Sequence, residues 1–357
     1  MAPTMRSFFL PTGYGRPSTY ELGDLPKPTI STPDNVLIKV HAASLNPIDM
    51  RYAEGTMKLM FPSQQFPSKI GYDASGVIEE VGDEARGKGW KVGDEVFVRL
   101  PHEHRGSLSE YALTTSYYVA RKPSNISHVE AASLPLVSMT AYQAFGRIEG
   151  GREGLKGKSV MVTAGMGGAG SIGIQLAKVF GAHVTTTMSK SKMARAKEIF
   201  PGTVDRYIDY KSEDITTVIK PRSLDFIFDT AGGNVSSLFP LLKEKHKMVS
   251  IAAMPNGGGM RSQFPDTPWY ISSGLDLYAW WRTSGPAGKN RVEYEYHWLK
   301  PNGEDLAAIG KLVEGGKVKP VVGEVHRFDQ DGCRKAAEVV MGRGSSNGGK
   351  VVIKVVD

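Results

Sequence analysis

A glycine-rich turn lies in the middle of the chain, between a short apolar strand and an amphipathic helix. The strand is predicted at residues 159–163 (SVMVT), and the helix begins directly after the turn. Glycines let a backbone turn tightly and approach a pyrophosphate, whose charge is stabilised by the amides and dipole of the helix N-terminus. In this context the turn predicts a nucleotide site more than a structural bend. The predicted cofactor-binding residues of the turn are Gly165, Met166, Gly167, Gly168, Ala169 and Gly170.

The end of the next strand, predicted at residues 183–187, indicates which nucleotide binds. NAD sites place an Asp or Glu about 20 residues after the turn, on the ribose 2′-hydroxyl, whereas a 2′-phosphate needs cations and hydroxyls there. Ser189, Lys190 and Lys192 follow this strand, and the first acidic residue is Glu198. We therefore expect NADPH as the cofactor. The alternative is that these lysines only form the solvated face of a helix.

The composition is typical of a soluble globular protein with room for two domains, since 357 residues are 40% hydrophobic and 23% charged. The net charge of +7 favours anionic partners, but no cluster of basic residues interleaves with aromatic ones, so a phosphorylated cofactor is expected and nucleic acid is not. The single cysteine, Cys333, excludes an intramolecular disulfide and a thiolate cluster. No apolar stretch has the length of a membrane helix, and we expect a cytoplasmic protein with no membrane partner.

Hydrophobic patterns divide the chain into three segments. Residues 1–126 contain short strands broken by Gly and Pro, residues 127–320 alternate helices with apolar strands, and residues 321–357 return to β character. The alternation indicates βαβ units and a parallel sheet, so the fold class is α/β. Strands are expected at residues 36–40, 74–81 and 94–98 in the first segment and at 159–163, 183–187, 206–208, 224–229 and 247–252 in the second, with VVIKVV as a closing strand.

Several segments together resemble the medium-chain dehydrogenase/reductase superfamily, and specifically its zinc-independent quinone oxidoreductase-like and enoyl reductase-like branch. They are AASLNPIDMRYAEG, IGYDASGVIEEVG, VGDEVF, GSLSEYA, AASLPLVSMTAYQAF, the glycine-rich turn, IDYKSED, FDTAGG and GGKVVI. The resemblance implies a GroES-like β-rich catalytic domain, built from residues 1–126 and 321–357. It also implies a Rossmann NADP-binding domain with a doubly wound parallel sheet at residues 127–320, and a homodimer by family habit.

The zinc-dependent alcohol dehydrogenases of this superfamily hold their catalytic metal with a Cys, a His and a further Cys or Asp. Matching the motifs places Asn46, Tyr72 and Leu136 at these positions. None of the three is a normal zinc ligand, because zinc prefers thiolate, imidazole or carboxylate. Asp49 and Asp73 lie nearby, where a salt-bridged structural role is expected. The four-cysteine lobe of a structural zinc is also missing, so we expect no metal.

The resemblance further implies catalytic roles for Asn46 and Tyr72. Asn46 is expected near the nicotinamide and the substrate carbonyl, where its amide could donate a hydrogen bond. Tyr72 is expected to donate a hydrogen bond or to supply the proton for an enolate. The alternatives are that Asn46, which precedes Pro47, only caps a turn and that Tyr72 only packs.

Other residues are assigned to the cofactor by the same resemblance. Thr140 is expected to pack behind the nicotinamide, and Tyr210 to cover the 2′-phosphate or the adenine. Lys350 or Arg343 is expected to approach the cofactor from the closing strand.

The expected activity is hydride transfer from NADPH to a quinone or to the conjugated C=C of an α,β-unsaturated carbonyl, a small-molecule substrate. Enoyl thioesters are disfavoured, because Met57 stands at the position of the proton-donating Tyr of mitochondrial-type enoyl reductases, and Tyr52 has the wrong spacing. His102 and His104 are expected to be solvent-exposed loop residues without a chemical role.

The sequence is also compatible with two alternative functions. One is a pathway-specific reductase of a bulky aromatic or polyketide-like metabolite, which Trp280 and Trp281 would suit. The other is a non-catalytic NADPH-binding scaffold. Four tryptophans lie within residues 255–301 and are expected either as core or dimer-contact residues or as an apolar wall over the substrate: Trp269, Trp280, Trp281 and Trp298.

Overall fold

The computed structural model describes residues 3–58, 64–342, 345 and 347–356, and the chain divides into two compact units. The first unit comprises Met1–Met139 and Lys300–Asp357, and the second comprises Thr140–Leu299. These limits differ from the domain boundaries expected at residues 126/127 and 320/321. The reason is packing: helix α3 (His128–Ala132) contacts the strands β3 (Asn35–Leu45) and β5 (Asp73–Val81), and helix α11 (Gly303–Glu314) contacts β8 (Val119–Arg121) of the first unit.

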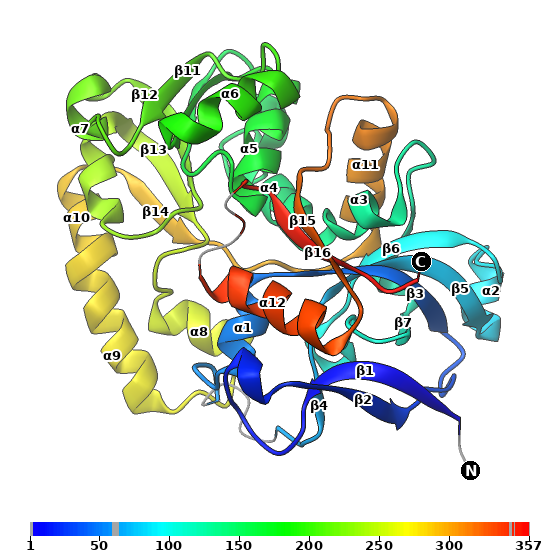
Figure 1. Cartoon of the computed structure of the whole chain (residues 1–357). Helices are drawn as coiled ribbons and strands as arrows, with labels where there is room; N and C mark the ends of the chain where they lie inside the picture. Colours follow the sequence, from blue (N-terminus) through cyan, green and yellow to red (C-terminus); the bar gives the residue numbers. More distant parts are fainter. Residues whose placement is uncertain (1–2, 59–63, 343–344, 346, 357) are drawn as a thin grey trace. The chain divides into compact units, whose positions relative to one another are not determined.

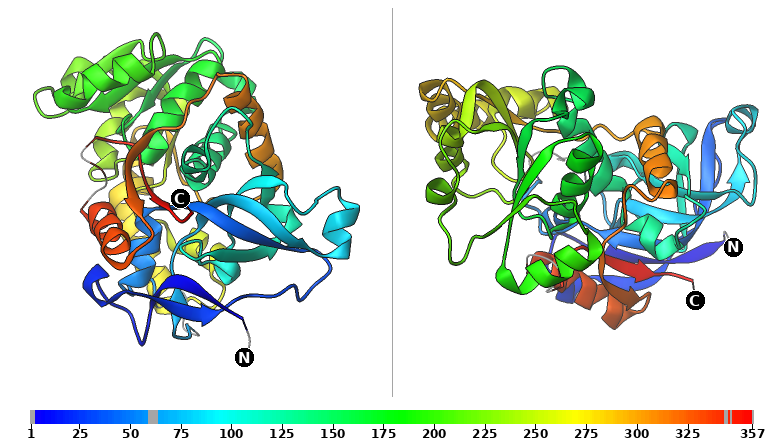
Figure 2. Two further views of the ribbon diagram at one scale, coloured as in Figure 1. Left: turned by 45° about the vertical axis from the view of Figure 1, so that its right-hand side comes forward. Right: turned by 90° about the horizontal axis from the view of Figure 1, so that it is seen from above.

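The larger sheet of the first unit joins the two ends of the chain. Its strand order is β15-β16-β3-β5-β6-β8, and a further strand, β7, pairs with β3. The last strand of the chain, β16 (Lys350–Lys354), runs antiparallel to β3, with Val352 opposite Ser44. Figures 1 and 2 show this closing strand in red beside the blue β3. The remaining strands of the sheet are β6 (Glu95–Arg99), β7 (Tyr111–Thr115) and β15 (Val322–Arg327).

A smaller sheet and several helices complete the first unit. The sheet has the order β2-β1-β4, and its core includes an edge-to-face pair, Phe8 and Tyr20, with ring centroids 5.8 Å apart. Helix α12 (Gln330–Met341) packs on β15 and β16 and buries Cys333 in the core. The other elements are β1 (Thr4–Leu10), η1 (Pro17–Thr19), β2 (Glu21–Pro26), α1 (Pro47–Ala53), β4 (Ser68–Lys69), α2 (Asp83–Gly87), η2 (His102–His104) and η3 (Ser116–Tyr118), and helix α4 (Pro135–Phe145) continues into the second unit.

The second unit is built on a six-stranded parallel sheet with the order β11-β10-β9-β12-β13-β14. Counted from the first strand of this unit, the order is 3-2-1-4-5-6, which is the Rossmann arrangement. All six residues of the central strand β12 are buried, in agreement with a sheet covered on both faces. The strands are β9 (Ser159–Val162), β10 (His183–Met188), β11 (Arg206–Asp209), β12 (Leu224–Asp229), β13 (Leu242–Ser250) and β14 (Glu293–Tyr296).

Helical elements cover both faces of the parallel sheet. On one face, α5 (Gly168–Val179) packs so closely that a Cβ at Gly173 would lie 3.1 Å from the Phe228 ring. On the other face, Met161 and Ile227 belong to a cluster with side chains of η5 (Val235–Leu241) and α10 (Gly285–Lys289). The doubly wound α/β class is confirmed. The remaining helices are η4 (Gly151–Leu155), α6 (Lys190–Ile199), α7 (Ile215–Val218), α8 (Gly257–Gln263), α9 (Trp269–Ala279) and the π-helical turn η6 (Trp280–Ser284).

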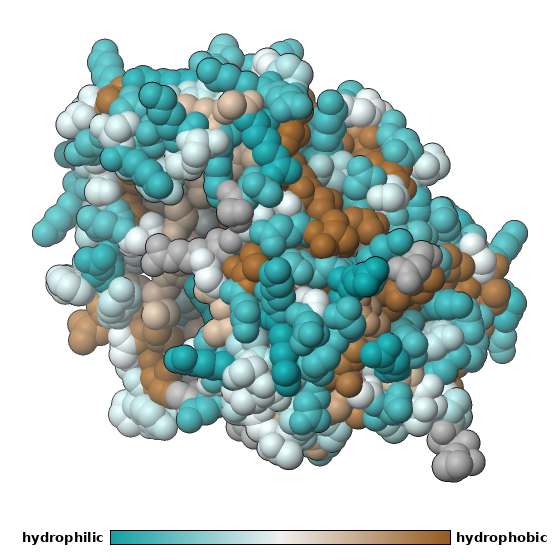
Figure 3. Space-filling model, in the orientation of Figure 1, coloured by the Kyte–Doolittle hydropathy of each residue, from teal (hydrophilic) through white to brown (hydrophobic). Residues whose placement is uncertain are grey.

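The tryptophan-rich segment does not lie in the core. Trp269 is 77% exposed, and Trp280 and Trp281 are each 65% exposed. The expectation of core residues is therefore wrong for these three side chains, because α9 and η6 pack through small residues, Ser272, Ala279 and Thr283. Figure 3 shows pale and brown residues interrupting the hydrophilic surface at lower left, where Figure 1 draws α9. No helix within the described ranges is long and apolar enough to cross a membrane.

Candidate functional site

The side chain of Asn46 is fixed at both ends of its amide. Asn46 lies between β3 and α1 and is buried. Its Nδ2 donates to Asp73 Oδ2 at 2.9 Å, and its Oδ1 accepts from the Lys350 ammonium. Its backbone N–H donates to Asp49 Oδ2 at 2.6 Å. Asn46 is the N-cap residue of α1, with Asp49 as its capping-box partner, and its side chain also points into this polar network.

Asp73 is the centre of the network. Its carboxylate is fully buried at the start of β5. Besides Asn46, it accepts hydrogen bonds from Ser44 Oγ at 3.3 Å and from the Leu136 backbone N–H at 3.0 Å, and it pairs with Lys350 Nζ at 3.3 Å. Two of the positions matched to zinc ligands, Asn46 and Leu136, thus donate hydrogen bonds to one carboxylate.

Lys350 carries the positive charge of the network. Its Nζ also donates to the Leu45 carbonyl oxygen at 3.0 Å, so the strands β16 and β3 meet through this side chain. Burial lowers the pKa of the ammonium, and the neighbouring Asp73 and Asp49 oppose that effect. The structure therefore places Lys350, which was expected to approach the cofactor, with its amine turned to Leu45, Asn46 and Asp73.

Burial also shifts the pKa of the second carboxyl group of the network, Asp49. It raises the pKa of Asp49 to about 7, against the opposing effect of the Asn46 N–H and with the support of the Asp73 charge. Two carboxyl groups thus share one ammonium, and protonation of Asp49 relieves the excess negative charge.

These residues do not form a zinc site. Asn46 is engaged at both amide ends, Leu136 offers an apolar side chain, and burial raises the pKa of the Tyr72 phenol, which keeps it protonated. Zinc takes thiolate, imidazole or carboxylate ligands. Across the described part of the chain, no group of three or more His, Cys, Asp or Glu side chains is arranged to hold a metal.

Tyr72 lies beside two arginines and a histidine. Its ring is buried, and the Arg99 guanidinium lies over it, 4.4 Å from the ring centroid. Its hydroxyl is 2.8 Å from His102 Nδ1. Burial raises the pKa of Tyr72, and Arg99 opposes the shift. The site therefore holds a protonated phenol against a polar partner, and Tyr72 does more than pack.

The loop that follows β6 is part of this environment. Arg105 donates to His102 Nε2 at 3.1 Å, to Gln64 Oε1 at 2.6 Å and to Ser68 Oγ at 2.8 Å, and it also contacts the Tyr52 hydroxyl. Burial lowers the pKa of His102 to about 3, with Arg105 and Arg99 adding to the shift. The expectation of exposed histidines is wrong, since His102 and His104 are half-buried. Met57 is half-buried in the turn after α1 and has no polar group to offer.

The glycine-rich turn of the second unit connects β9 to α5. Its start is tied to β10, because the Ala164 N–H donates to Thr187 Oγ1 at 2.9 Å and the Gly165 N–H to Thr187 O at 3.0 Å. Ala164 adopts a positive φ of 51°, an uncommon conformation that such sites retain when the surroundings impose it. A Cβ at Gly170 would overlap the Ala164 carbonyl oxygen. The turn therefore has the tight backbone expected of a phosphate cradle: Gly165, Met166 and Gly170 are buried, and Gly167, Gly168 and Ala169 are partly exposed.

The helix α6 brings the predicted 2′-phosphate residues to one helix end. Ser189 is its N-cap residue, Lys190 is exposed and Lys192 is partly buried. A carboxylate that the sequence did not predict at this site, Asp209, ends β11. Hydrogen bonds from the Lys211 N–H, Ser212 Oγ and the Lys190 N–H lower its pKa. Asp209 therefore stays ionised, with its oxygens held by these donors. Only the parallel pairing of β10 with β11 could have revealed this carboxylate.

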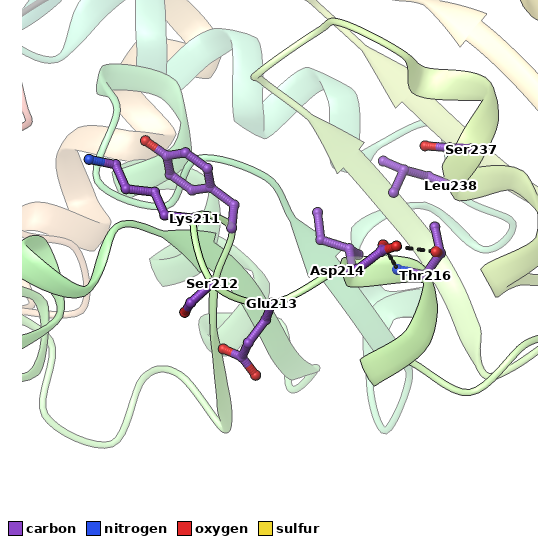
Figure 4. Close-up of a pocket in the computed structure, with 9 residues that line it drawn as sticks. Lys211, Ser212, Glu213, Asp214, Thr216, Ser237 and Leu238 are labelled. Carbon is purple, nitrogen blue, oxygen red and sulfur yellow. Dashed lines mark hydrogen bonds between the residues drawn. The ribbon is translucent and has the colours of Figure 1, made fainter.

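Tyr210 follows Asp209 and is 56% exposed. It lines an open pocket of ≈ 450 Å³ with Lys211, Glu213, Asp214 and Ser237, among others (Figure 4). Thr140 is buried in α4. Arg343 lies outside the described residues.

Comparisons with known proteins bear on both units. Residues 32–124 match the family model described as the alcohol dehydrogenase GroES-like domain, and residues 203–353 match the model described as zinc-binding dehydrogenase. The chain is 30% identical to the mitochondrial NAD(P)H oxidoreductase RTN4IP1 of Homo sapiens over 92% of this chain and 84% of that protein. It is 33% identical to the chloroplastic NADPH-dependent alkenal/one oxidoreductase of Arabidopsis thaliana, over 81% of this chain and 64% of that protein. The solved quinone oxidoreductase of Coxiella burnetii has a TM-score of 0.79 at 28% identity, covering 99% of this chain and 100% of that one.

The raised pKa of Asp49 predicts a pH-dependent stability. Between its unfolded value, near 3.8, and its folded value, about 7, the native state holds a proton that the unfolded state has released. The contribution of Asp49 to the free energy of unfolding is therefore fully present below about pH 4. It is lost as the pH rises to 7, by at most about 1.4 kcal/mol per pH unit. Asp49→Asn keeps an acceptor for the Asn46 N–H but does not ionise. Its free energy of unfolding in urea should decline less than that of the wild type between pH 5 and 7.

The control for this measurement is Asp83→Asn, because the Asp83 side chain is fully exposed. Its stability should follow the wild-type pH dependence. If the free energy of unfolding of Asp49→Asn fell with pH as steeply as that of the wild type, the titrating group would not be Asp49.

Proposed function

The chain belongs to the medium-chain dehydrogenase/reductase superfamily, in its quinone oxidoreductase-like branch, and on that premise we propose an NADPH-dependent, zinc-independent reductase. Its substrate is a quinone or the conjugated C=C of an α,β-unsaturated carbonyl. The observation that carries the proposal is the network at the positions matched to zinc ligands. Asn46 and Leu136 there bind Asp73, and Tyr72 keeps its proton.

The choice of acceptor follows from this chemistry. Without a Lewis acid to polarise an isolated carbonyl, hydride transfer is favoured to an acceptor that delocalises the resulting negative charge. Quinones and enones meet this requirement. The names of two relatives, an alkenal/one oxidoreductase of Arabidopsis thaliana and a quinone oxidoreductase of Coxiella burnetii, support the same two substrate classes.

NADPH, when bound, supplies the hydride. The proposed cofactor residues are the glycine-rich turn, Thr140, Tyr210, and Ser189 with Lys190 and Lys192 at the start of α6. Ser189 offers a hydroxyl and the lysines offer positive charge toward a 2′-phosphate, while the ionised carboxylate of Asp209 is engaged by hydrogen bonds from Lys211 and Ser212.

The residues of the first unit act on the substrate. Tyr72 donates a hydrogen bond to the substrate oxygen or the proton that completes the reduction, since its raised pKa keeps the phenol protonated. Asn46 uses one Nδ2 hydrogen on Asp73 and retains the second for the substrate carbonyl. The held amide is preorganised, so little free energy is needed to orient it.

We propose the cytosol as the compartment, because a single cysteine, buried in the core, forms no intramolecular disulfide and so requires no oxidising environment. A cell fractionation with antibody detection checks this assignment.

A first experiment tests metal content and activity together. The purified protein should contain no stoichiometric zinc by elemental analysis and should oxidise NADPH with a small quinone or a simple enone, with or without a chelator. A larger conjugated ketone tests for a substrate of the bulky aromatic class. Stoichiometric zinc, or loss of activity with chelator, would contradict zinc independence. Quenching of tryptophan fluorescence by NADPH with no turnover of any acceptor would instead favour a non-catalytic scaffold.

Tyr72→Phe tests the proton donor. The variant keeps the ring under Arg99 and loses the hydroxyl, so kcat for an enone should fall by on the order of 100-fold, the low end for loss of a general acid. The Kd for NADPH, measured by fluorescence, should stay unchanged. Tyr117→Phe, at an exposed tyrosine of the same unit, is the matched control. An unchanged kcat for Tyr72→Phe would remove Tyr72 from the mechanism.

Charge reversal at α6 tests the choice of cofactor. Lys190→Glu combined with Lys192→Glu should weaken NADPH binding at least about tenfold, while NADH binding changes little, because only NADPH places a phosphate against the new carboxylates. Lys197→Glu, in the last turn of the same helix, is the control for charge reversal alone. Equal losses for NADPH and NADH would disprove a 2′-phosphate site at these lysines.

A further inference from the structure

The hydrogen bonds around His102 determine which of its nitrogens carries the proton. An arginine guanidinium has donors and no acceptor, so the His102 Nε2 that lies 3.1 Å from Arg105 must present its lone pair. A neutral imidazole has one N–H, which must then be at Nδ1. The Nδ1–H points to the Tyr72 hydroxyl oxygen at 2.8 Å and therefore donates to it.

His102 remains neutral at physiological pH. Burial, with the charges of Arg105 and Arg99, lowers its pKa to about 3. An imidazolium would also place an N–H against the guanidinium, donor against donor. The neutral Nδ1–H tautomer is thus favoured by geometry and by charge.

Arg105 is itself held in place. Its guanidinium donates to Ser68 Oγ at 2.8 Å and to Gln64 Oε1 at 2.6 Å, and it lies 3.9 Å from the centroid of the Tyr52 ring while contacting the Tyr52 hydroxyl. Partners from α1, the β4 strand and the segment before it hold the donor that faces His102. The tautomer is therefore fixed by three separate parts of the first unit.

We infer that His102 is a positioning residue for Tyr72: Arg105 fixes its Nδ1–H tautomer, and the Nδ1–H occupies a lone pair of the Tyr72 oxygen, so that the Tyr72 proton is directed to the substrate. This inference rests on the proposed function, in which Tyr72 is the donor. If His102 had the opposite tautomer, its Nδ1 would accept a hydrogen bond from the Tyr72 O–H. That proton would then point to His102 and away from the substrate.

The proton transfer balances within these groups. After hydride has added to the β-carbon of an enone, the Tyr72 O–H bond breaks and its proton passes to the enolate. The electron pair stays on the Tyr72 oxygen, where the His102 Nδ1–H stabilises it together with the positive charges of Arg99 and Arg105. A proton from bulk solvent then restores the Tyr72 phenol, so that each turnover consumes one hydride from NADPH and one proton from solvent.

The tautomer is measured directly by ¹⁵N NMR of the full-length protein labelled with [¹⁵N]histidine, with NADPH bound. The ring nitrogens of His102, assigned by the loss of its signals in His102→Gln, should show a protonated Nδ1 and an unprotonated Nε2 at pH 7. A protonated Nε2, or a charged ring, would overturn the inference. This measurement requires no turnover, so its result is independent of whether the proposed substrate class is correct.

A matched pair of amide variants tests the effect on catalysis. The amide of His102→Asn lies near the position of Nδ1 and can donate to Tyr72, whereas that of His102→Gln lies near Nε2 and cannot. His102→Gln should lower kcat for an enone by about tenfold, as expected for loss of one hydrogen bond worth about 1.4 kcal/mol, and His102→Asn by no more than about threefold.

A double-variant cycle separates positioning from a general structural effect. In the Tyr72→Phe background His102→Gln should cause no further loss of kcat, because the group through which it acts is gone. An equal loss in both backgrounds, or equal losses for the Asn and Gln variants, would overturn the inference. If Tyr72→Phe alone leaves kcat unchanged while the NMR result holds, the proposed role of Tyr72 is wrong and the tautomer assignment stands.

Discussion

A buried ammonium group has to be compensated by carboxylate, and in this protein that requirement connects the last strand of the chain to its first long one. Lys350 is nearly inaccessible to solvent and reaches Asp73 and the amide of Asn46. An unpaired charge at this depth would cost several kcal/mol, so removing Lys350 would leave the buried Asp73 carboxylate without its cation. The position of β16 beside β3 and the orientation of Asn46 therefore depend on the same ion pair.

This ion pair also explains how the site maintains its shape around residues whose types are not those of zinc ligands. Zinc would orient its ligands by coordination, whereas here Asp73 orients Asn46 and the Leu136 backbone through hydrogen bonds. The charges are not balanced, because Asp49 adds a second carboxyl group, and the protein accommodates it by raising the pKa of Asp49 to about 7.

Tyr72 depends on a second set of interactions. Burial keeps its proton in place, while Arg99, His102 and Arg105 surround it with donors and positive charge. These two influences act in opposite directions on the pKa of Tyr72: burial raises it, and the positive charges of Arg99 and Arg105 lower it. The loop residues His102 and Arg105 contact Tyr72 as a chain, Arg105 to His102 and His102 to the Tyr72 hydroxyl.

The sequence by itself determined the fold class, five of the six strands of the parallel sheet and the glycine-rich turn, because each depends on a local pattern: a period, a run of apolar residues, or glycines between a strand and a helix. The sixth strand, β14 (Glu293–Tyr296), was not predicted, because its sequence EYEY contains no apolar run. It also determined which residue types stand at the positions matched to zinc ligands. Only the tertiary structure decided the direction of the Lys350 side chain, since Lys350 and Asn46 are 304 positions apart. The same holds for the partners of His102, for the carboxylate of Asp209 beside α6 and for the exposure of three tryptophans. These features depend on which distant segments pack together, and no local pattern of residues contains that information.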